Sequence, residues 1–160
     1  MTTVDASLVV SSVVDMLRAV LAPVPVGHSE SSEPDLNLSE TERAQVGELI
    51  VARVATTANG LGTSANGLTP GYLDDPNQMR VVKFLFTGIG YQADHAELIA
   101  SRALSVFVQC DELTGAYAFP LPVPGHRVER RIGAGEGSAD RIAPYRWQAS
   151  TRVDVTVQAF

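Results

Sequence analysis

The sequence predicts a single α+β domain, residues 1–160, in which a mostly antiparallel sheet carries an N-terminal and a central helix on one face. Two segments, 5–21 and 94–110, repeat apolar residues at helical spacing, and three others alternate as strands do. The order helix, strands, helix, strands is typical of α+β domains. With 45% apolar and 19% charged residues, the chain can bury one core.

The first helix is predicted over Asp5 to Leu21. Its apolar residues recur every three or four positions, whereas Asp15 and Arg18 lie on the other side. Pro23 and Pro25 follow and end the helix, because proline cannot continue the backbone hydrogen bonding.

The next stretch, 23–38, is rich in Gly, Ser, Glu and Pro and predicts an exposed loop or arm. Ser39 and Glu42 have the spacing of a capping box, which indicates a short helix. Alternation in Glu48 to Thr57 then predicts a strand, and a helix continuing from Ser39 is the competing interpretation.

A long protruding hairpin loop is predicted over 58–76. The tetrapeptide Ala-Asn-Gly-Leu occurs there twice and contributes Asn59, Leu61, Asn66 and Leu68. Asn-Gly pairs favour turns with positive φ.

Strong alternation over Gln78 to Gly88 predicts a strand with one strongly apolar face. A helix is expected next, from Asp94 to about Cys110. Asp94 is suited to cap it, and Cys110 falls on its broad apolar stripe, where we expect a buried small side chain.

Two further strands are predicted near the C-terminus, His126 to Ile132 and Tyr145 to Phe160. Long loops at 111–125 and 133–144 separate the elements in this half of the chain. The first is Pro-rich and is expected to be extended from Gly115 to Gly125; the second contains alternating glycines. Long ordered loops usually have a function.

Charge and composition exclude several function classes. A net charge of −6 and a pI near 4.9 argue against nucleic-acid recognition and against docking on an anionic membrane. No apolar run is long enough to span a bilayer, and the N-terminus lacks the basic region of a secretory signal. The single Cys110 excludes an intrachain disulfide and a cysteine-based zinc site. We therefore expect a protein of the cytoplasm or of a particle assembled there.

No catalytic, metal or cofactor motif is found. The histidines, His28, His95 and His126, fall in separate segments without ligand spacing. The glycines near 60 and 133 match neither a dinucleotide fingerprint nor a phosphate loop. We therefore predict a protein that is not an enzyme and needs no cofactor.

Arginines gather at the C-terminal end, where His126 to Phe160 contains six arginines and four acidic residues. A solvated edge is the simpler interpretation. The sharper hypothesis is an intersubunit contact, because arginine forms geometrically specific ion pairs. The predicted interface residues are Arg127, Arg130, Arg131 and Arg141, together with Asn59, Leu61, Asn66 and Leu68 of the 58–76 loop.

The layout resembles that of the tail terminator (tail completion) proteins of long-tailed bacteriophages. The segments most alike are Met79-Arg-Val-Val-Lys-Phe-Leu-Phe86 and Asp94-His-Ala-Glu-Leu-Ile-Ala-Ser-Arg-Ala103. The similarity is a pattern of elements over about two thirds of the chain. It implies a homo-oligomeric ring, commonly a hexamer, that caps the tail tube, joins it to the head–tail connector and remains in the neck of the virion. It implies no reaction.

Other functions compete with this one. The same layout suits a cap of a contractile injection system or a head-completion protein. A small-molecule binding module would place its pocket between the sheet and the 94–110 helix. An enzyme with an unfamiliar site would have to use Asp94, His95 and Arg102.

Overall fold

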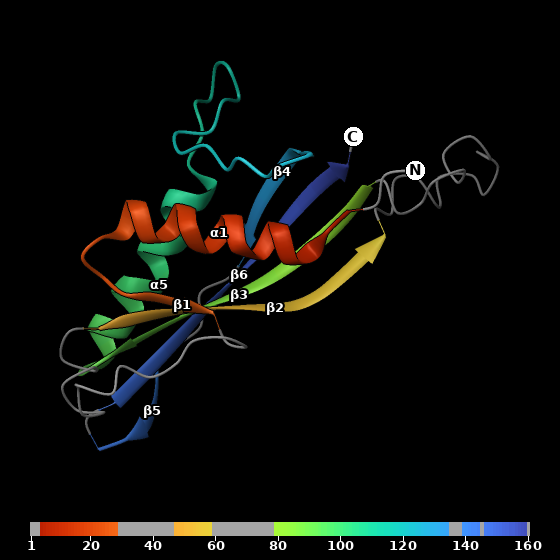
Figure 1. Cartoon of the computed structure of the whole chain (residues 1–160). Coiled ribbons are helices and arrows are strands. Elements are labelled where there is room, and N and C mark those ends of the chain that lie inside the picture. The colour runs from red at the N-terminus through yellow and green to blue at the C-terminus, as the bar shows by residue number, and fades with distance from the viewer. Residues whose placement is uncertain (1–3, 29–46, 59–78, 135–138, 145, 160) are drawn as a thin grey trace.

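The computed structural model describes residues 4–28, 47–58, 79–134, 139–144 and 146–159 (Figure 1). Within these ranges, two helices and six strands follow one another. They are α1 (Ala6–Leu21), β1 (Val26–His28), β2 (Glu48–Ala58), β3 (Met79–Gly90), α5 (Ala93–Val108), β4 (His126–Ala134), β5 (Asp140–Ala143) and β6 (Arg146–Ala159).

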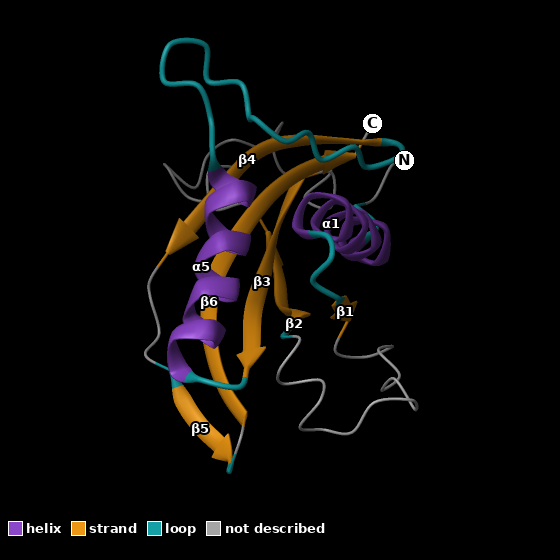
Figure 2. Ribbon diagram, turned by 90° about the vertical axis from the view of Figure 1, so that its left-hand side faces the viewer, coloured by secondary structure: helices purple, strands orange, loops and turns teal. Residues whose placement is uncertain are grey.

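The strands form one sheet in the order β1-β2-β3-β6-β4, and β5 pairs with the other half of the long β6. Every pairing is antiparallel except that of β1 with β2. Figure 2 shows α1 and α5 on the same, concave side of the curved sheet. The predicted α+β class, with a mostly antiparallel sheet and two helices on one face, is confirmed.

Strict alternation in the central strands determines which face is buried. In β3, Val82, Phe84 and Phe86 point toward the helices and are almost inaccessible to solvent. In β6, Val153 and Val155 do the same, directly beside Phe84 and Val82 in the antiparallel register, and Val157 is also buried. The side chains between them point to the opposite face. A period of two therefore gives each strand one core face and one outer face.

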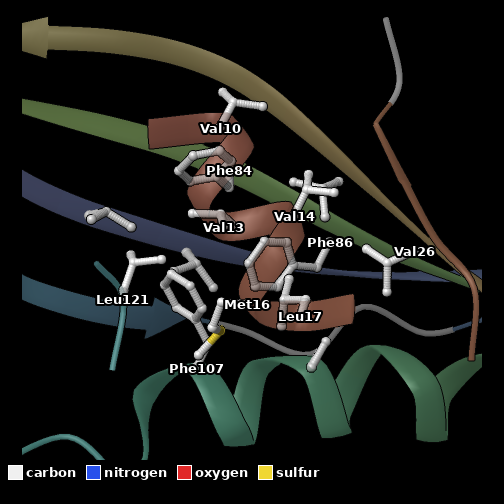
Figure 3. Packing of buried hydrophobic residues seen from close by; sticks show 14 of the residues in the cluster. Val10, Val13, Val14, Met16, Leu17, Val26, Phe84, Phe86, Phe107 and Leu121 are labelled. Atoms are coloured by element: carbon white, nitrogen blue, oxygen red, sulfur yellow. The ribbon is translucent and has the colours of Figure 1, made fainter. Parts of the chain in front are cut away.

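Helix α1 covers this apolar surface with a broad stripe of its own (Figure 3). Val13 and Leu17 are fully buried, and Phe86 of β3 packs edge-to-face with Phe107 of α5 at 5.4 Å between ring centroids. The Asp5 carboxylate accepts hydrogen bonds from the amides of Ser7 and Leu8 and so caps the helix.

Helix α5 approaches the sheet very closely where β3 carries glycine. A Cβ at Gly88 would collide with the backbone oxygen of Ala96 and would lie 2.8 Å from the nitrogen of Ala100. Ala96 and Ala100 are buried, so small residues on both sides bring the helix and the strand together. At Gly88 the helix and the strand are therefore in direct contact.

Two short strands lie where loops were predicted. Val26–His28 forms β1 within the expected 23–38 arm, and Val26 is buried. Asp140–Ala143 forms β5 within the expected 133–144 loop, and Gly133 belongs to β4. Strands of three or four residues contain too little alternation to be recognised, and pairing with a long neighbour stabilises them.

The ends of α5 also differ from the prediction. Gln92 occupies the N-cap position without a side-chain hydrogen bond, and Asp94 lies in the first turn. The helix ends at Val108, so Cys110 lies beyond it and is exposed rather than buried on the apolar stripe. The chain turns away because Gln109 adopts an extended conformation.

The strand prediction for Glu48 to Thr57 is confirmed, and a helix there is wrong. The predicted helix at Ser39 and the 58–76 loop after Ala58 lie outside the described residues. Neither α1 nor α5 is both long and apolar enough to cross a bilayer.

The close approach at Gly88 gives a first prediction. Gly88→Ala places a methyl group against helix backbone that cannot rotate away, and we expect the free energy of unfolding to fall by about 1–3 kcal/mol. Urea denaturation measures it.

The control is Gly115→Ala. A Cβ there meets no atom within 4 Å, so only the positive φ of 73° opposes it, at a cost of about 1 kcal/mol. Equal losses in the two variants would contradict the steric account.

Candidate interaction surface

Arg131, one of the predicted interface residues, lies in the interior and is only 7% exposed. Its register partner is Val155, which points to the core. Nη1 donates hydrogen bonds to the carbonyl oxygens of Phe107, at 3.1 Å, and Phe119, at 2.7 Å. The guanidinium thus joins the end of α5, the following loop and β4, and Arg131 does not present its side chain at the surface.

Two aromatic rings flank this guanidinium. Its central carbon lies 4.2 Å from the ring centroid of Tyr117 and 5.3 Å from that of Phe107. The Tyr117 hydroxyl accepts a hydrogen bond from the Arg131 amide at 2.8 Å and donates one to the Arg131 carbonyl oxygen at 3.3 Å. Side chain and backbone of Arg131 are therefore both held by Tyr117.

Burial lowers the pKa of the Arg131 guanidinium from its ordinary value, and the nearby Tyr117 partly offsets this. Arginine nonetheless keeps its proton in proteins. A permanent charge is held inside the molecule, where the two carbonyl oxygens and two aromatic faces replace water.

Tyr117 closes the base of a small projection, the 110–117 hairpin, which rises from the end of α5 (Figure 2). Cys110 and Tyr117 form its last bridge, and the Asp111 amide donates to the Ala116 oxygen at 2.8 Å. The Gly115 amide donates to the Asp111 oxygen at 2.7 Å, and the Asp111 carboxylate accepts from the Leu113 amide. Leu113, at the tip, is 95% exposed.

The other predicted arginines are exposed but do not converge on one point. Arg127 forms an ion pair with Glu129 at 3.1 Å on β4, and Arg130 points away from the core. Arg141, on β5, donates to the Pro144 oxygen. Asn59, Leu61, Asn66 and Leu68 lie outside the described residues.

The face of the sheet opposite the helices is a second candidate surface. Both described helices pack on the other side, so the outward side chains of four strands share this face. They mix aliphatic, hydroxyl and charged groups. They include Ile50 of β2, Val81, Lys83 and Leu85 of β3, Arg152, Asp154 and Thr156 of β6, and Arg130 and Ile132 of β4. We call them the open face.

A groove of about 300 Å³ lies at the other side of the molecule, between α1 and strands β1 and β2. It combines apolar, hydroxyl and charged groups. Its lining residues are Ser7, Val10, Ser11, Val14, Asp15, Arg18, His28 and Arg53. The Arg18 Nε donates to the Val26 oxygen at 2.9 Å and fixes that side chain across the groove.

The cluster that an enzyme would need is not assembled by α5. Asp94 and Arg102 are exposed and are separated by eight helical residues, about 12 Å along the axis. His95 is half-buried, close to Gly47 and Gly90. Within the described part of the chain, no three His, Cys, Asp or Glu side chains lie close enough to hold a metal ion.

Sequence reasoning missed the hairpin and its anchor. Asp111 and Gly115 are typical turn residues and were the available signal for the hairpin. Tyr117 and Arg131 were the available signal for its anchor. A cation–π contact across fourteen residues cannot be inferred from spacing, however, and a Pro-rich segment beside it suggested only an extended connection.

No known protein-family model matches this sequence, and no curated protein sequence is significantly similar to it.

The buried position of Arg131 predicts a large effect of its removal. Arg131→Met leaves two carbonyl oxygens without their donor, and we expect the free energy of unfolding to fall by about 2–4 kcal/mol. Urea denaturation measures the loss.

The neighbouring Arg130→Met is the matched control. Its side chain is exposed, so we expect a change within about 0.5 kcal/mol. If the two substitutions cost the same, the Arg131 contacts do not stabilise the fold.

Proposed function

We propose that this chain is a structural assembly protein that forms a homo-oligomeric ring, of the kind that terminates phage tails. The observation that carries the proposal is the open face. Burial of its aliphatic side chains against another subunit would be favourable. Its charged side chains can fix the orientation of the two subunits. The open face would be covered, at least in part, by a neighbouring subunit.

The composition of the open face suits a subunit contact. Ile132 of β4 is 43% exposed and stands directly opposite Asp154, which also faces Lys83 in the register. Arg152 stands opposite Leu85. Aliphatic area interrupted by charges of both signs is typical of specific interfaces between subunits that are also folded on their own.

Side-chain contacts are favoured over strand addition at the β4 edge. A bulge between Val128 and Arg130 breaks the ladder, and Arg127, Glu129 and Arg130 place charges along the strand. Both features protect an edge against pairing with another strand. Arg127 and Arg130 would therefore contact a neighbour through their guanidinium groups.

The order of elements supports the tail terminator assignment. A first helix, an antiparallel strand pair, a helix and a long last strand occur here as α1, β2 with β3, α5 and β6. On this proposal the ring, commonly a hexamer, caps the tail tube and joins it to the head–tail connector. The protein would then remain in the neck of the virion after assembly in the host cytoplasm.

Molar mass measured by light scattering over a concentration series tests the proposal. We expect the purified chain to form a discrete oligomer that negative-stain images show as a closed ring. A protein that stays monomeric throughout the series and forms no ring would sink the proposal.

A substitution on the open face tests its role in the subunit contact. Ile132→Ser removes aliphatic area, and we expect the dissociation constant of the oligomer to rise by about tenfold. Sedimentation velocity on a dilution series gives this constant.

Ile142→Ser is the control for Ile132→Ser. Ile142 has a similar exposure, 44%, but lies on β5, which pairs with the opposite end of β6 from β4. An oligomer that responds equally to both substitutions would argue against the open face as the contact.

A further inference from the structure

The 110–117 hairpin is built as a rigid projection. Four hydrogen bonds hold it: the Asp111 amide donates to the Ala116 oxygen, the Gly115 amide to the Asp111 oxygen, and the amides of Leu113 and Thr114 to the Asp111 carboxylate. Its base is fixed by Tyr117 and Arg131. A projection held in this way loses little conformational entropy on docking.

The tip of the hairpin combines one apolar side chain with negative charge. Leu113 is 95% exposed, the highest value among the exposed large hydrophobic residues. Asp111 and Glu112 precede it and are also exposed. Single exposed leucines are common, but this one is held away from the body at the end of an ordered hairpin.

The groove beside α1 has the complementary character. Val10 and Val14 line its floor with a small apolar area, being 8% and 5% exposed, while Arg18 and Arg53 are charged and exposed at its margin. Asp15 pairs with Arg18 at 3.9 Å, an exposed contact that contributes little. The groove, about 300 Å³, is larger than one leucine side chain.

The two features lie apart on one molecule. In Figures 1 and 2 the hairpin rises above the helices, whereas β1 and the adjoining part of β2 lie below α1. One copy can therefore use its groove and its hairpin at the same time, with different neighbours. Such head-to-tail contacts close into a ring when the rotation per subunit allows it.

We propose that the 110–117 hairpin of one copy docks in the α1 groove of the next copy. Leu113 inserts beside Val10 and Val14, and Glu112 faces Arg18 and Arg53. The inference rests on the proposed function, since it names surfaces through which subunits of that assembly meet. It adds a second contact to that of the open face.

Truncation of the tip tests the apolar part. Leu113→Ser removes the inserted side chain, and the dissociation constant of the oligomer, measured by sedimentation velocity, is expected to rise at least tenfold. Leu98→Ser is the control, because Leu98 is also exposed, at 64%, but lies on α5. The oligomer of the Leu98→Ser variant is expected to keep the wild-type dissociation constant.

Charge reversal tests the polar part. Glu112→Arg and Arg53→Glu each weaken association at low salt, and the double variant recovers most of the loss. Circular dichroism confirms that every variant is folded. If the losses of association free energy in the two single variants simply add in the double variant, the proposed contact of Glu112 with Arg53 is overturned.

Cross-linking gives a positional readout. Ser11→Cys adds one thiol in the groove, and the native Cys110 is exposed at the base of the hairpin. A short bismaleimide should join Cys110 of one copy to position 11 of another, identified by peptide mass mapping. If Cys110 of one copy is joined only to Cys110 of another, the proposed docking of the hairpin in the groove is overturned.

The outcomes separate the two proposals. An oligomer that is weakened by Ile132→Ser but is unaffected by Leu113→Ser keeps the assembly function and overturns the hairpin contact. A wild-type protein that is monomeric at every concentration overturns both.

Discussion

A buried guanidinium organises one end of this molecule. Arg131 lies between the rings of Phe107 and Tyr117 and donates to the carbonyl oxygens of Phe107 and Phe119. These contacts tie α5, the following loop and β4 together. These contacts offset part of the cost of removing the charge from water, although the Arg131 Nε has no hydrogen-bond partner among the described residues. Tyr117, at the base of the hairpin, is held by Arg131 in the same way.

The rest of the fold follows from a sheet covered on one side. Alternation in β3 and β6 sends Phe84, Phe86 and Val155 into the core and leaves Lys83 and Asp154 on the open face. A bulge and charges on β4 protect the edge of the sheet. The molecule thus offers an open face, a rigid hairpin and a basic groove, all of which an assembly protein can use and none of which requires chemistry.

The extent to which the sequence predicted this structure depends on the length of each pattern. Long periodic segments, α1, α5, β3 and β6, were predicted to within a few residues, since many positions repeat one signal. The short strands β1 and β5 depend on long neighbours and were missed. Arg131 was expected at the surface because charge suggests exposure; its burial depends on Tyr117 and Phe107, which no local pattern connects to it.

Hydrogen exchange at the Asp111 and Gly115 amides tests the central claim most directly, because both are bonded only within the hairpin. If the Arg131 contacts hold the hairpin, these amides are protected in the wild-type protein. In Arg131→Met they exchange rapidly, while amides in the paired segments of β3 and β6 stay protected. Rapid exchange of both amides in the wild-type protein, with a protected sheet, would contradict the account.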